Sequence, residues 1–407
     1  MLPATSLPGN ACDQTATAKV TLALGPAFEP LVSRFCADPE APLALAVSGG
    51  SDSTALLDLM TDWASRSDRN LIVLTVDHGL RSEAAAEAAH VKHLSTALGH
   101  QHQTLIWAKP RAGQNAARDA RHRLLAHAAK QAGAAVLLLG HTLDDVIETI
   151  HIRRRRGTAE AFLAGPVLAA PSPVWPEGRD CTLIRPLIMT PRDDLRAWLT
   201  DKGRSWIDDP SNENTDFERI EVRKSLAEAA VDEKARVSEV LNLLNMRASY
   251  DQLLGDAIRD HVVVQPSGLI EMRTGGLPDR LQARLAPLIA RVAGGHDRTP
   301  RAEPVRAMLD SLLHPGARAT LGGAWFQKTA DGLWIGRDPV ELNSKLECDL
   351  WDGRYTPEVM ANLTVEDTPF LLRQSLPPGP HWRPVLGDRL ALEQKIYQTP
   401  LFNPVQR

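Results

Sequence analysis

Four short apolar runs alternate with longer helix-like stretches in the first part of this 407-residue chain, and this alternation restricts the fold more than any other feature. The runs are LALAVS (43–48), LIVLTVDHG (71–79), HQTLIW (102–107) and AVLLLGH (135–141). The stretches between them, 51–65, 82–98 and 115–132, are rich in Ala, Leu and charged residues. Nearly continuous apolar strands separated by helices indicate a parallel sheet that is covered on both faces. We therefore expect a doubly wound α/β domain, in which ligands bind beyond the carboxyl ends of the strands.

The remaining segments predict how the chain is organised around this domain. Residues 165–181, rich in Pro and Gly, are typical of a loop, and 191–203 is typical of a helix that begins at Pro191. Between 226 and 262 the pattern is helical, and a further helix at 301–313 precedes a hairpin that turns at Asp331-Gly332. We expect a loose tail (1–25), the α/β catalytic domain (26–225), a helical linker or subdomain (226–298) and a small α+β region (299–407).

Composition narrows the class of protein. The net charge of -4 means that a nucleic-acid site would have to be a local basic patch. Cys12, Cys36, Cys181 and Cys348 are far apart in sequence, so no zinc or C-x-x-C spacing exists and we expect reduced thiols. We expect no secretory signal, and no apolar run approaches the ~18 to 20 residues that span a bilayer. These features predict a cytoplasmic protein without a membrane segment; a homodimer is one of the assemblies that the sequence leaves open.

A glycine-containing string, Ser48-Gly49-Gly50-Ser51-Asp52-Ser53, follows the first predicted strand and opens a helix. A tight glycine turn beside a helix N-terminus exposes backbone N–H groups that hold phosphate oxygens, and Ser hydroxyls add donors. The string is neither a Walker A loop, since no lysine follows, nor a G-x-G-x-x-G fingerprint. A plain Ser/Gly turn that caps a helix is the alternative, but the full string after a buried strand favours a phosphate site.

An acidic turn follows the fourth predicted strand, in GHTLDDVIET (140–149). In a helix that begins near Thr142, Glu148 is four residues from Asp144 and three from Asp145, so the three carboxylates crowd one turn. They suit a cation, either Mg²⁺ or a substrate amine, although a solvated acidic turn that complements the helix dipole is an alternative. The position at the carboxyl edge of the sheet favours the cation.

Two basic segments lie close to these motifs. The run Arg153–Arg156 is either an exposed basic turn or a contact for RNA phosphates, and the sequence does not decide between them. The segment NAARDARHRLL (115–125) places Arg118 and Arg121 three residues apart, where a basic helix could clamp phosphates as charge develops.

The string SGGSDS resembles the pyrophosphate loop of the N-type ATP pyrophosphatases, and the motifs taken together resemble bacterial tRNA(Ile)-lysidine synthetases. The matching strings are AVSGGSDSTALL (46–57), VDHGLRSEA (76–84), AARDARHRLL (116–125), GHTLDDVIET (140–149), RRGT (155–158), IRPLI with PRDDL (184–195) and WIDDPSN (206–212). The resemblance covers residues 40 to 225 strongly and 300 to 338 weakly. The chain departs from the family pattern at Thr142, Val146, His122 and Ile220, and none of these departures removes a charged group from the site.

The resemblance implies an activity and a role for each motif. Such an enzyme uses ATP to adenylate the C2 oxygen of the wobble cytidine in an isoleucine tRNA with a CAU anticodon, and free lysine then displaces AMP. The resemblance implies that Ser48 to Ser53 bind ATP and that Asp52 also holds Mg²⁺. It assigns stabilisation of phosphate charge to Arg121, with Arg118 as the alternate. Asp145 and Glu148 would bind the lysine amine, with Asp145 as the base. The segment 205–225, with Asp208, Asp209, Asn212 and Arg219, would close one face of the site.

Three other interpretations remain open from the sequence alone. A tRNA 2-thiolation enzyme of the same superfamily would need reactive cysteines, usually a C-x-x-C, which the chain lacks. An amidating enzyme similar to GMP or NAD synthetases would use ammonia, often from an attached domain that is not visible here. A non-catalytic RNA-binding module with a relic nucleotide loop is a third interpretation, against which the intact Asp52, Asp145 and Glu148 speak.

Overall fold

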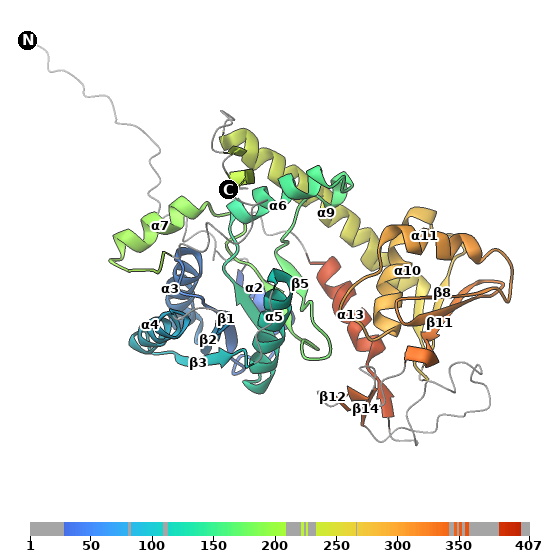
Figure 1. Ribbon diagram of the computed structural model, residues 1–407, viewed down its shortest axis with the longest axis horizontal. Helices are drawn as coiled ribbons and strands as arrows, with labels where there is room; N and C mark the ends of the chain where they lie inside the picture. Colours follow the sequence, from blue (N-terminus) through green and yellow to red (C-terminus); the bar gives the residue numbers. More distant parts are fainter. Residues whose placement is uncertain are drawn as a thin grey trace, which may run out of the picture.

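The computed structural model of the chain contains two lobes that are joined along a long helix (Figure 1). It describes residues 28–79, 83–108, 113–208, 221–223, 225–226, 233–265, 267–341, 346–347, 350–351, 355–357 and 382–399. The first lobe is built on a sheet with the order β3-β2-β1-β4-β6-β5, and the second on a sheet with the order β7-β8-β11-β10-β9. No helix in the described part of the chain combines the length and apolar character that crossing a membrane would take.

The first sheet confirms the predicted parallel core. Its strands are β1 (Leu43–Ala46), β2 (Leu71–Asp77), β3 (Gln101–Ile106), β4 (Val136–Leu139), β5 (Ala169–Pro171) and β6 (Thr182–Ile184). Neighbours from β3 to β6 pair in parallel, so the carboxyl ends of these strands lie at one edge of the sheet. The expectation that 165–181 is only a loop was wrong, because β5 forms there and pairs antiparallel with β6.

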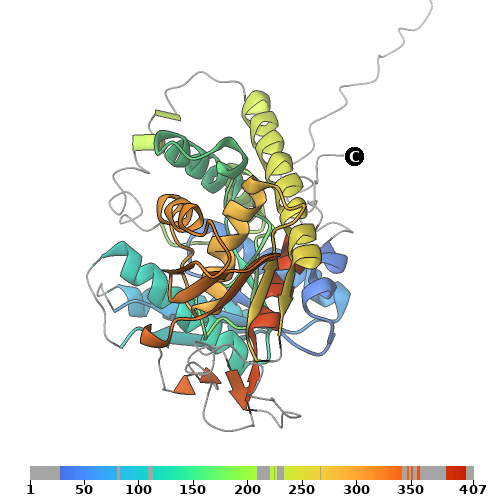
Figure 2. The ribbon, with the colours of Figure 1, turned by 90° about the vertical axis from the view of Figure 1, so that its right-hand side faces the viewer.

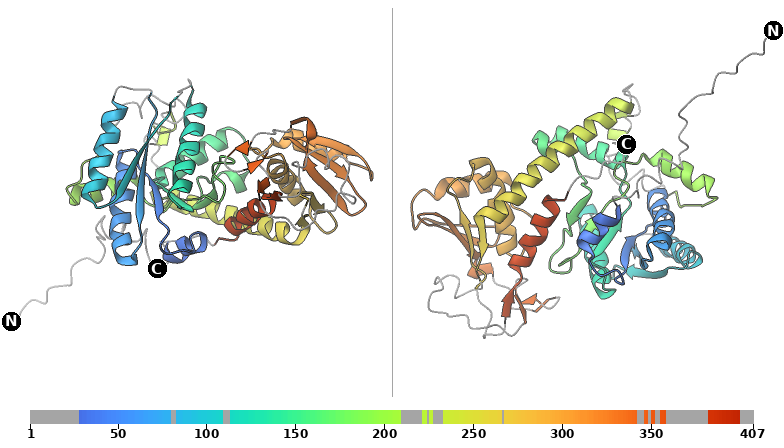
Figure 3. Two further views of the ribbon diagram at one scale, coloured as in Figure 1. Left: turned by 90° about the horizontal axis from the view of Figure 1, so that it is seen from below. Right: turned by 180° about the vertical axis from the view of Figure 1, so that it is seen from behind.

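Helices cover both faces of this sheet, as the view from below shows (Figure 3, left). They are α2 (Phe28–Phe35), α3 (Ser51–Ser67), α4 (Ala84–Ala97), α5 (Gln114–Gln131), α6 (Leu143–Arg155) and α7 (Arg192–Asp201). Strand alternation assigns the faces: Leu43 and Leu45 of β1 join the core that includes α3, whereas Ala44 between them joins the core that includes α5. The sheet is therefore doubly wound, as the apolar runs predict.

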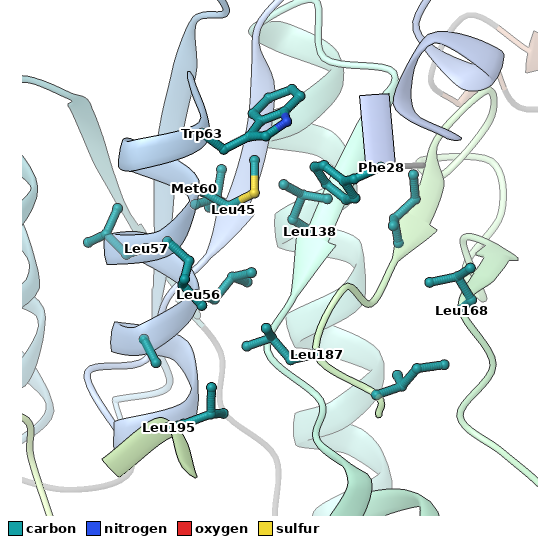
Figure 4. Close-up of a cluster of buried hydrophobic side chains, with 14 of the residues drawn as sticks. Phe28, Leu45, Leu56, Leu57, Met60, Trp63, Leu138, Leu168, Leu187 and Leu195 are labelled. Atoms are coloured by element: carbon teal, nitrogen blue, oxygen red, sulfur yellow. The ribbon is translucent and has the colours of Figure 1, made fainter. Parts of the chain in front are cut away.

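The larger core shows why α3 packs as it does (Figure 4). Leu56, Met60 and Trp63 recur at helical spacing on one face of α3 and are at most 5% exposed. The ring of Phe28 meets that of Trp63 edge to face with centroids 5.1 Å apart. Each such side chain stabilises the fold by roughly 1.5–3 kcal/mol through burial. This packing holds the N-terminus of α3 firmly at the end of β1.

The second lobe begins with the long helix α9 (Glu233–His261), which runs past the first lobe to the second sheet (Figures 1 and 2). Its other elements are β7 (Val262–Val264), β8 (Ile270–Arg273), α10 (Asp279–Ala293), α11 (Ala302–Ser311), β9 (Arg318–Leu321), β10 (Ala324–Lys328) and β11 (Gly332–Arg337). The predicted hairpin is confirmed, with Phe326 opposite Ile335 across β10 and β11. The helical patterns of 226–262 and 301–313 are confirmed by α9 and α11, but the segment expected as a helical linker also contains β7 and β8.

Further contacts hold the two lobes together. Helix α13 (Leu386–Tyr397) packs against both α9 and β5. On α5, Arg123 pairs with Glu177 at 2.5 Å and with Asp297 of the second lobe, and Asp119 pairs with Arg298 at 2.6 Å.

The remaining described elements are short. The strands β12 (Leu346–Glu347), β13 (Leu350–Trp351), β14 (Tyr355–Pro357) and β15 (Trp382–Pro384) form a third sheet, and η2 (Glu160–Phe162) and η4 (Pro339–Glu341) are short 3-10 turns.

Candidate active site

The glycine loop lies between β1 and α3, at the carboxyl edge of the first sheet. Gly49 has φ +91°, a left-handed conformation that suits glycine, and a Cβ there would lie 2.7 Å from Cδ1 of Ile207. The Ile207 N–H also donates to the Gly49 carbonyl at 2.9 Å. Residue 49 must therefore be small and permissive, since the segment after α7 packs directly on the loop.

Side-chain hydroxyls keep the loop in shape. The Ser53 hydroxyl lies 3.2 Å from the Ser48 amide, which donates to it, and donates in turn to the Gly50 carbonyl at 3.1 Å. Thr54 donates through Oγ1 to the Gly49 carbonyl at 3.1 Å, and its N–H makes the first intrahelical bond, to Gly50. The N–H groups of the residues before Thr54 have no acceptor within the helix, so the N-terminus of α3 offers them to an anion.

A second glycine brings the acidic turn up to the loop. A Cβ on Gly140, which follows β4, would lie 3.1 Å from the Asp52 carbonyl oxygen and 3.1 Å from Cα of Ser53. A side chain at residue 140 would press on the backbone at the start of α3, so glycine favours this close approach of the end of β4. The GH pair at 140–141 is the sequence signal for this contact, and the acidic turn begins directly after it.

The predicted helix near Thr142 is confirmed as α6, with Thr142 as its N-cap, but its carboxylates already have partners. Asp145 accepts hydrogen bonds from the Thr142 amide at 2.8 Å and the Thr142 hydroxyl at 3.0 Å, so it caps its own helix. Asp144 accepts the backbone N–H of Arg192 at 2.8 Å. Glu148, whose side chain is 3% exposed, pairs with Nε of Arg223 at 2.6 Å. The acidic turn is therefore built into the fold and is not a freely solvated patch.

Arg192 is the residue that joins the two motifs, and the sequence assigned it no role. Its Nε donates to Oδ2 of Asp52 at 2.9 Å, its Nη2 lies 3.8 Å from Oδ2 of Asp145 and its Nη1 lies 4.0 Å from Oε1 of Glu148. One guanidinium thus reaches the carboxylate beside the glycine loop and two carboxylates of the acidic turn. The signal that could have found it is its position at the start of α7, after the neighbouring strand β6 at the same sheet edge.

The pKa values of the two aspartates that face Arg192 are shifted in opposite directions. Burial raises the pKa of Asp52, and the nearby Asp145 charge adds to this, so that the Arg192 contact does not restore the ordinary value. Burial acts in the same direction on Asp145, but the neighbouring His141, donors from Thr142 and the Arg192 charge together outweigh it and hold its pKa below the ordinary value. Asp145 is therefore an ionised carboxylate at neutral pH.

A basic cluster lies beside the acidic turn. Arg118 and Arg121 lie on the first turns of α5, close enough to influence the buried His122 and also His141. Burial, reinforced by nearby arginines, lowers the pKa of each histidine to about 3, so both imidazoles are neutral. Among the described residues, neither ring nitrogen of the buried His122 has a hydrogen-bond partner. His122 was noticed in the sequence only as a departure from the family, not as part of a site.

The third cation of the basic cluster, Arg185, was not predicted either. It follows β6 at the same sheet edge as His141 after β4, because Leu138 and Ile184 pair in parallel. Its Nη1 donates to the Val167 carbonyl at 2.8 Å, and burial followed by the Arg118 charge lowers its pKa to about 10. A cluster of arginines and neutral imidazoles at this edge suits an anionic ligand.

The arginine run at the end of α6 divides into two kinds of residue. Arg153 donates from Nη1 to the carbonyls of Phe162 at 2.9 Å and Ala164 at 3.1 Å, so it supports the following turn. Arg154, Arg155 and Arg156 are exposed; Arg154 pairs with Glu239 at 2.6 Å, and Arg155 lies 3.9 Å from Glu221. Only the exposed members are placed to contact another molecule.

Some predicted residues lie at the edge of the described segments or outside them. Asp208 is exposed and accepts the Trp206 indole N–H at 3.1 Å, whereas Asp209, Asn212 and Arg219 lie outside the described residues. Cys36 and Cys181 are free and buried, and burial raises the pKa of Cys181 to about 12; Cys12 and Cys348 lie outside the described residues. Within the described residues, no group of three or more His, Cys, Asp or Glu side chains is arranged to hold a metal ion.

The fold and the glycine loop define a protein of the PP-loop class, and the family model described as PP-loop domain matches residues 25–230. The tRNA(Ile)-lysidine synthase of Hyphomonas neptunium is 38% identical over 290 residues, which cover 70% of this chain and 78% of that protein. The tRNA(Ile)-lysidine synthase of Caulobacter vibrioides is 36% identical over 338 residues, covering 80% of this chain and 75% of that protein. That of Ruegeria pomeroyi is 35% identical over 340 residues, covering 80% and 78%. The chain belongs to the tRNA(Ile)-lysidine synthase family.

Proposed function

We propose that this protein joins free lysine to C2 of the wobble cytidine of an isoleucine tRNA with a CAU anticodon, using ATP and giving lysidine, AMP and pyrophosphate. The observation that carries the proposal is the reach of Arg192, which lies 2.9 Å from Asp52 of the glycine loop and 3.8 Å from Asp145 of the acidic turn. The proposed phosphate site and the proposed amine site would therefore be neighbours within the span of one side chain. Membership of the tRNA(Ile)-lysidine synthase family supports the same reaction.

The glycine loop is the proposed ATP site. Ser48, Gly49, Gly50, Ser51 and Ser53 would hold the pyrophosphate through backbone N–H groups and hydroxyls at the N-terminus of α3. Asp52, at that terminus with the Ser51 hydroxyl 3.0 Å away, fits a partial ligand set for Mg²⁺. Magnesium commonly takes one or two protein carboxylates and completes its shell with phosphates and water. When bound, it would neutralise phosphate charge.

The acidic turn is the proposed amine site. Asp145 and Glu148 would hold the ε-ammonium of lysine, because a carboxylate that is shielded from water attracts a cation strongly. An ammonium is not a nucleophile, so it must lose a proton before its nitrogen attacks C2 of the base. Asp145 is the base that we assign, since it is ionised and so able to accept that proton.

The basic cluster is the proposed site at which the negative charge on the phosphate is stabilised. As the C2 oxygen of cytidine attacks the α-phosphorus, pyrophosphate leaves and an adenylated base forms; lysine nitrogen then bonds to C2 and AMP departs with the oxygen. Arg121, or Arg118 beside it, would stabilise the negative charge on the phosphate through both steps. A single-stranded anticodon base can be splayed out to reach this edge of the sheet. ATP, free lysine and tRNA meet in the cytoplasm, where we place the activity.

Mass analysis of nucleosides tests the proposal and separates it from its rivals. Purified protein is incubated with ATP, lysine and an isoleucine tRNA transcript that has a CAU anticodon, and the tRNA is then digested to nucleosides. We expect cytidine to gain the mass of lysine minus water, and we expect no gain when ATP or lysine is omitted. A gain that corresponds to sulfur for oxygen would support the thiolation enzyme, and an unmodified tRNA that still binds would support the RNA-binding module.

A further inference from the structure

The Arg192 side chain occupies the space between the carboxylates to which the proposed function assigns the substrate cation. Its side chain is 19% exposed, and those of Asp52, Asp145 and Glu148 are 21%, 15% and 3% exposed. A guanidinium remains charged at any working pH. In the protein without ligands, a cation from the chain itself therefore already lies in the acidic turn.

The three acids hold this guanidinium unequally. Only the contact with Asp52, at 2.9 Å, has hydrogen-bond length; those with Asp145 and Glu148, at 3.8 Å and 4.0 Å, are longer ion pairs. A carboxylate that binds arginine tightly is usually met by two parallel N–H groups of the same fork. Glu148 is met in this way by Arg223, whose Nε and Nη2 lie 2.6 Å and 3.4 Å from the two carboxylate oxygens. Arg192 is thus shared among three acids and fully paired with none.

The placement of helix α7 rests on contacts other than the Arg192 guanidinium. Helix α7 is anchored by the Arg192 backbone N–H on Asp144, and by the buried Leu195, Trp198 and Leu199. The Trp198 indole also donates to Asp58 at 3.1 Å. The guanidinium can therefore leave the acids while α7 stays in place.

We propose that the Arg192 guanidinium is a displaceable counter-ion that fills the amine subsite when no lysine is bound, and that the ε-ammonium of lysine replaces it there. The inference rests on the proposed function, because lysine is the incoming cation. The exchange substitutes one single positive charge for another, so the carboxylates never face one another without a cation. Asp52 borders the nucleotide loop, and the phosphates of bound ATP provide the displaced guanidinium with a new anionic partner.

This role predicts the sign of a binding change. Because Arg192 competes with lysine for the same carboxylates, its removal strengthens lysine binding. If Arg192 were a fixed support that positions these carboxylates, its removal would weaken lysine binding. The direction of the change thus separates a competitor from a structural residue.

The experiment measures the Kd of free lysine by calorimetry with the full-length protein, its Arg192→Gln variant and two further variants. We expect Arg192→Gln to lower the Kd by about tenfold and the KM for lysine to fall with it, whereas Arg192→Lys, which restores a cation, stays near the wild type. Arg196→Gln is the matched control: its side chain is 46% exposed on the same helix, and it pairs with Asp208 at 3.7 Å, away from the three acids. An unchanged or higher Kd for a folded Arg192→Gln protein would overturn the inference.

A second measurement follows the Arg192 side chain in the wild-type protein and does not depend on the folding of Arg192→Gln. In protein with ¹⁵N-labelled arginine, the Nε–H signal of Arg192, identified by its loss in Arg192→Lys, should shift when lysine saturates the site. A signal that does not move would also overturn the inference. Lysidine formation is measured in parallel: a wild type that makes lysidine without these effects refutes the counter-ion alone, and a wild type that makes none refutes the proposed function and the counter-ion with it.

Discussion

The glycine loop and the acidic turn lie at the same edge of one sheet, but different kinds of contact hold them. The loop is shaped by the main chain: Gly49 adopts φ +91°, and hydroxyls of Ser53 and Thr54 bond to carbonyls within six residues of chain. The acidic turn is organised by side chains from distant segments, since Arg192 and Arg223 supply its cations. A site for an anion can be built from backbone N–H groups, whereas a site for a cation needs acids whose mutual repulsion must be offset by cations from elsewhere in the fold.

The largest expected effect tests the acidic turn, which is organised by side chains. We expect Asp145→Asn to reduce lysidine formation by at least about 100-fold, because it removes the proposed base and one charge that holds the amine. ATP binding should survive, since Asp145 is not part of the glycine loop. Lysidine is measured by mass analysis of nucleosides, and ATP affinity by calorimetry.

Asp144→Asn is the matched control in the same turn. Its amide oxygen can still accept the Arg192 N–H that Asp144 accepts at 2.8 Å, so we expect turnover within about threefold of the wild type. If the two variants lose activity equally, the turn acts as a generic acidic patch and the specific role of Asp145 is wrong.

The next largest effect tests the glycine loop, which is shaped by the main chain. Gly49→Ala should weaken ATP binding by about tenfold or more, because a left-handed conformation costs a residue with a Cβ roughly 1–2 kcal/mol. In addition, the new Cβ would lie 2.7 Å from Cδ1 of Ile207, so either the Ile207 side chain or the loop must shift. The Kd of ATP, measured by calorimetry, is the test.

Gly99→Ala is the matched control, a substitution at a positive-φ glycine outside the loop. Gly99 has φ +84°, no described atom lies within 4 Å of where its Cβ would be, and it follows α4, away from the loop. We expect this substitution to lower stability slightly and to leave ATP affinity unchanged. An ATP Kd for Gly49→Ala that matches that of the wild type would show that the loop does not bind the nucleotide.

A third prediction concerns the basic cluster beside the acidic turn. The pKa of His122 is about 3 in the folded protein, against an ordinary value of 6.5. Between these values the unfolded chain binds a proton that the folded chain does not, so the free energy of unfolding falls as the pH falls through this window. His122 alone should account for a loss of about 2 kcal/mol between pH 7 and pH 5.

Urea unfolding of the wild type and His122→Phe at both pH values checks this contribution. The variant should lose about 2 kcal/mol less than the wild type between pH 7 and pH 5, because Phe has no proton to bind. His141, which titrates in the same sense, is present in both proteins and cancels in the comparison. Equal losses in both proteins would mean that His122 is not a buried neutral imidazole.

The smallest expected effect concerns the arginine run (Arg153–Arg156), which lies outside both the glycine loop and the acidic turn. Arg154→Gln with Arg155→Gln should flatten the salt dependence of tRNA binding by about one slope unit for each phosphate that the protein no longer neutralises. Arg153→Gln is the control, since Arg153 donates to the carbonyls of Phe162 and Ala164 and should affect stability instead of the slope. Filter binding across a salt series measures the slope, and an unaltered slope in the double variant would make the run a solvated surface.

The fold was predictable because its signals are local. The apolar runs predict β1 to β4, the position of Thr142 predicts the start of α6, and Asp331-Gly332 predicts the hairpin of β10 and β11. The edge strand β5 was missed because three residues that pair antiparallel with β6 leave no periodic pattern. Strands β7 and β8 were missed for a related reason, since they are short and follow a long helical pattern directly.

The sequence by itself determined the parallel sheet, the glycine loop and the acidic turn, because strand periodicity, a positive-φ glycine and helix spacing depend only on near neighbours in the chain. Only the tertiary structure decided which cations face the acids: Arg192 lies 140 residues from Asp52 along the chain but 2.9 Å from it in space. Charge pairing across such distances depends on how helices are placed around the sheet, and no short pattern of residues encodes that placement. The same reason explains why the buried, neutral imidazole of His122 emerges only once α5, β4 and β6 are packed together.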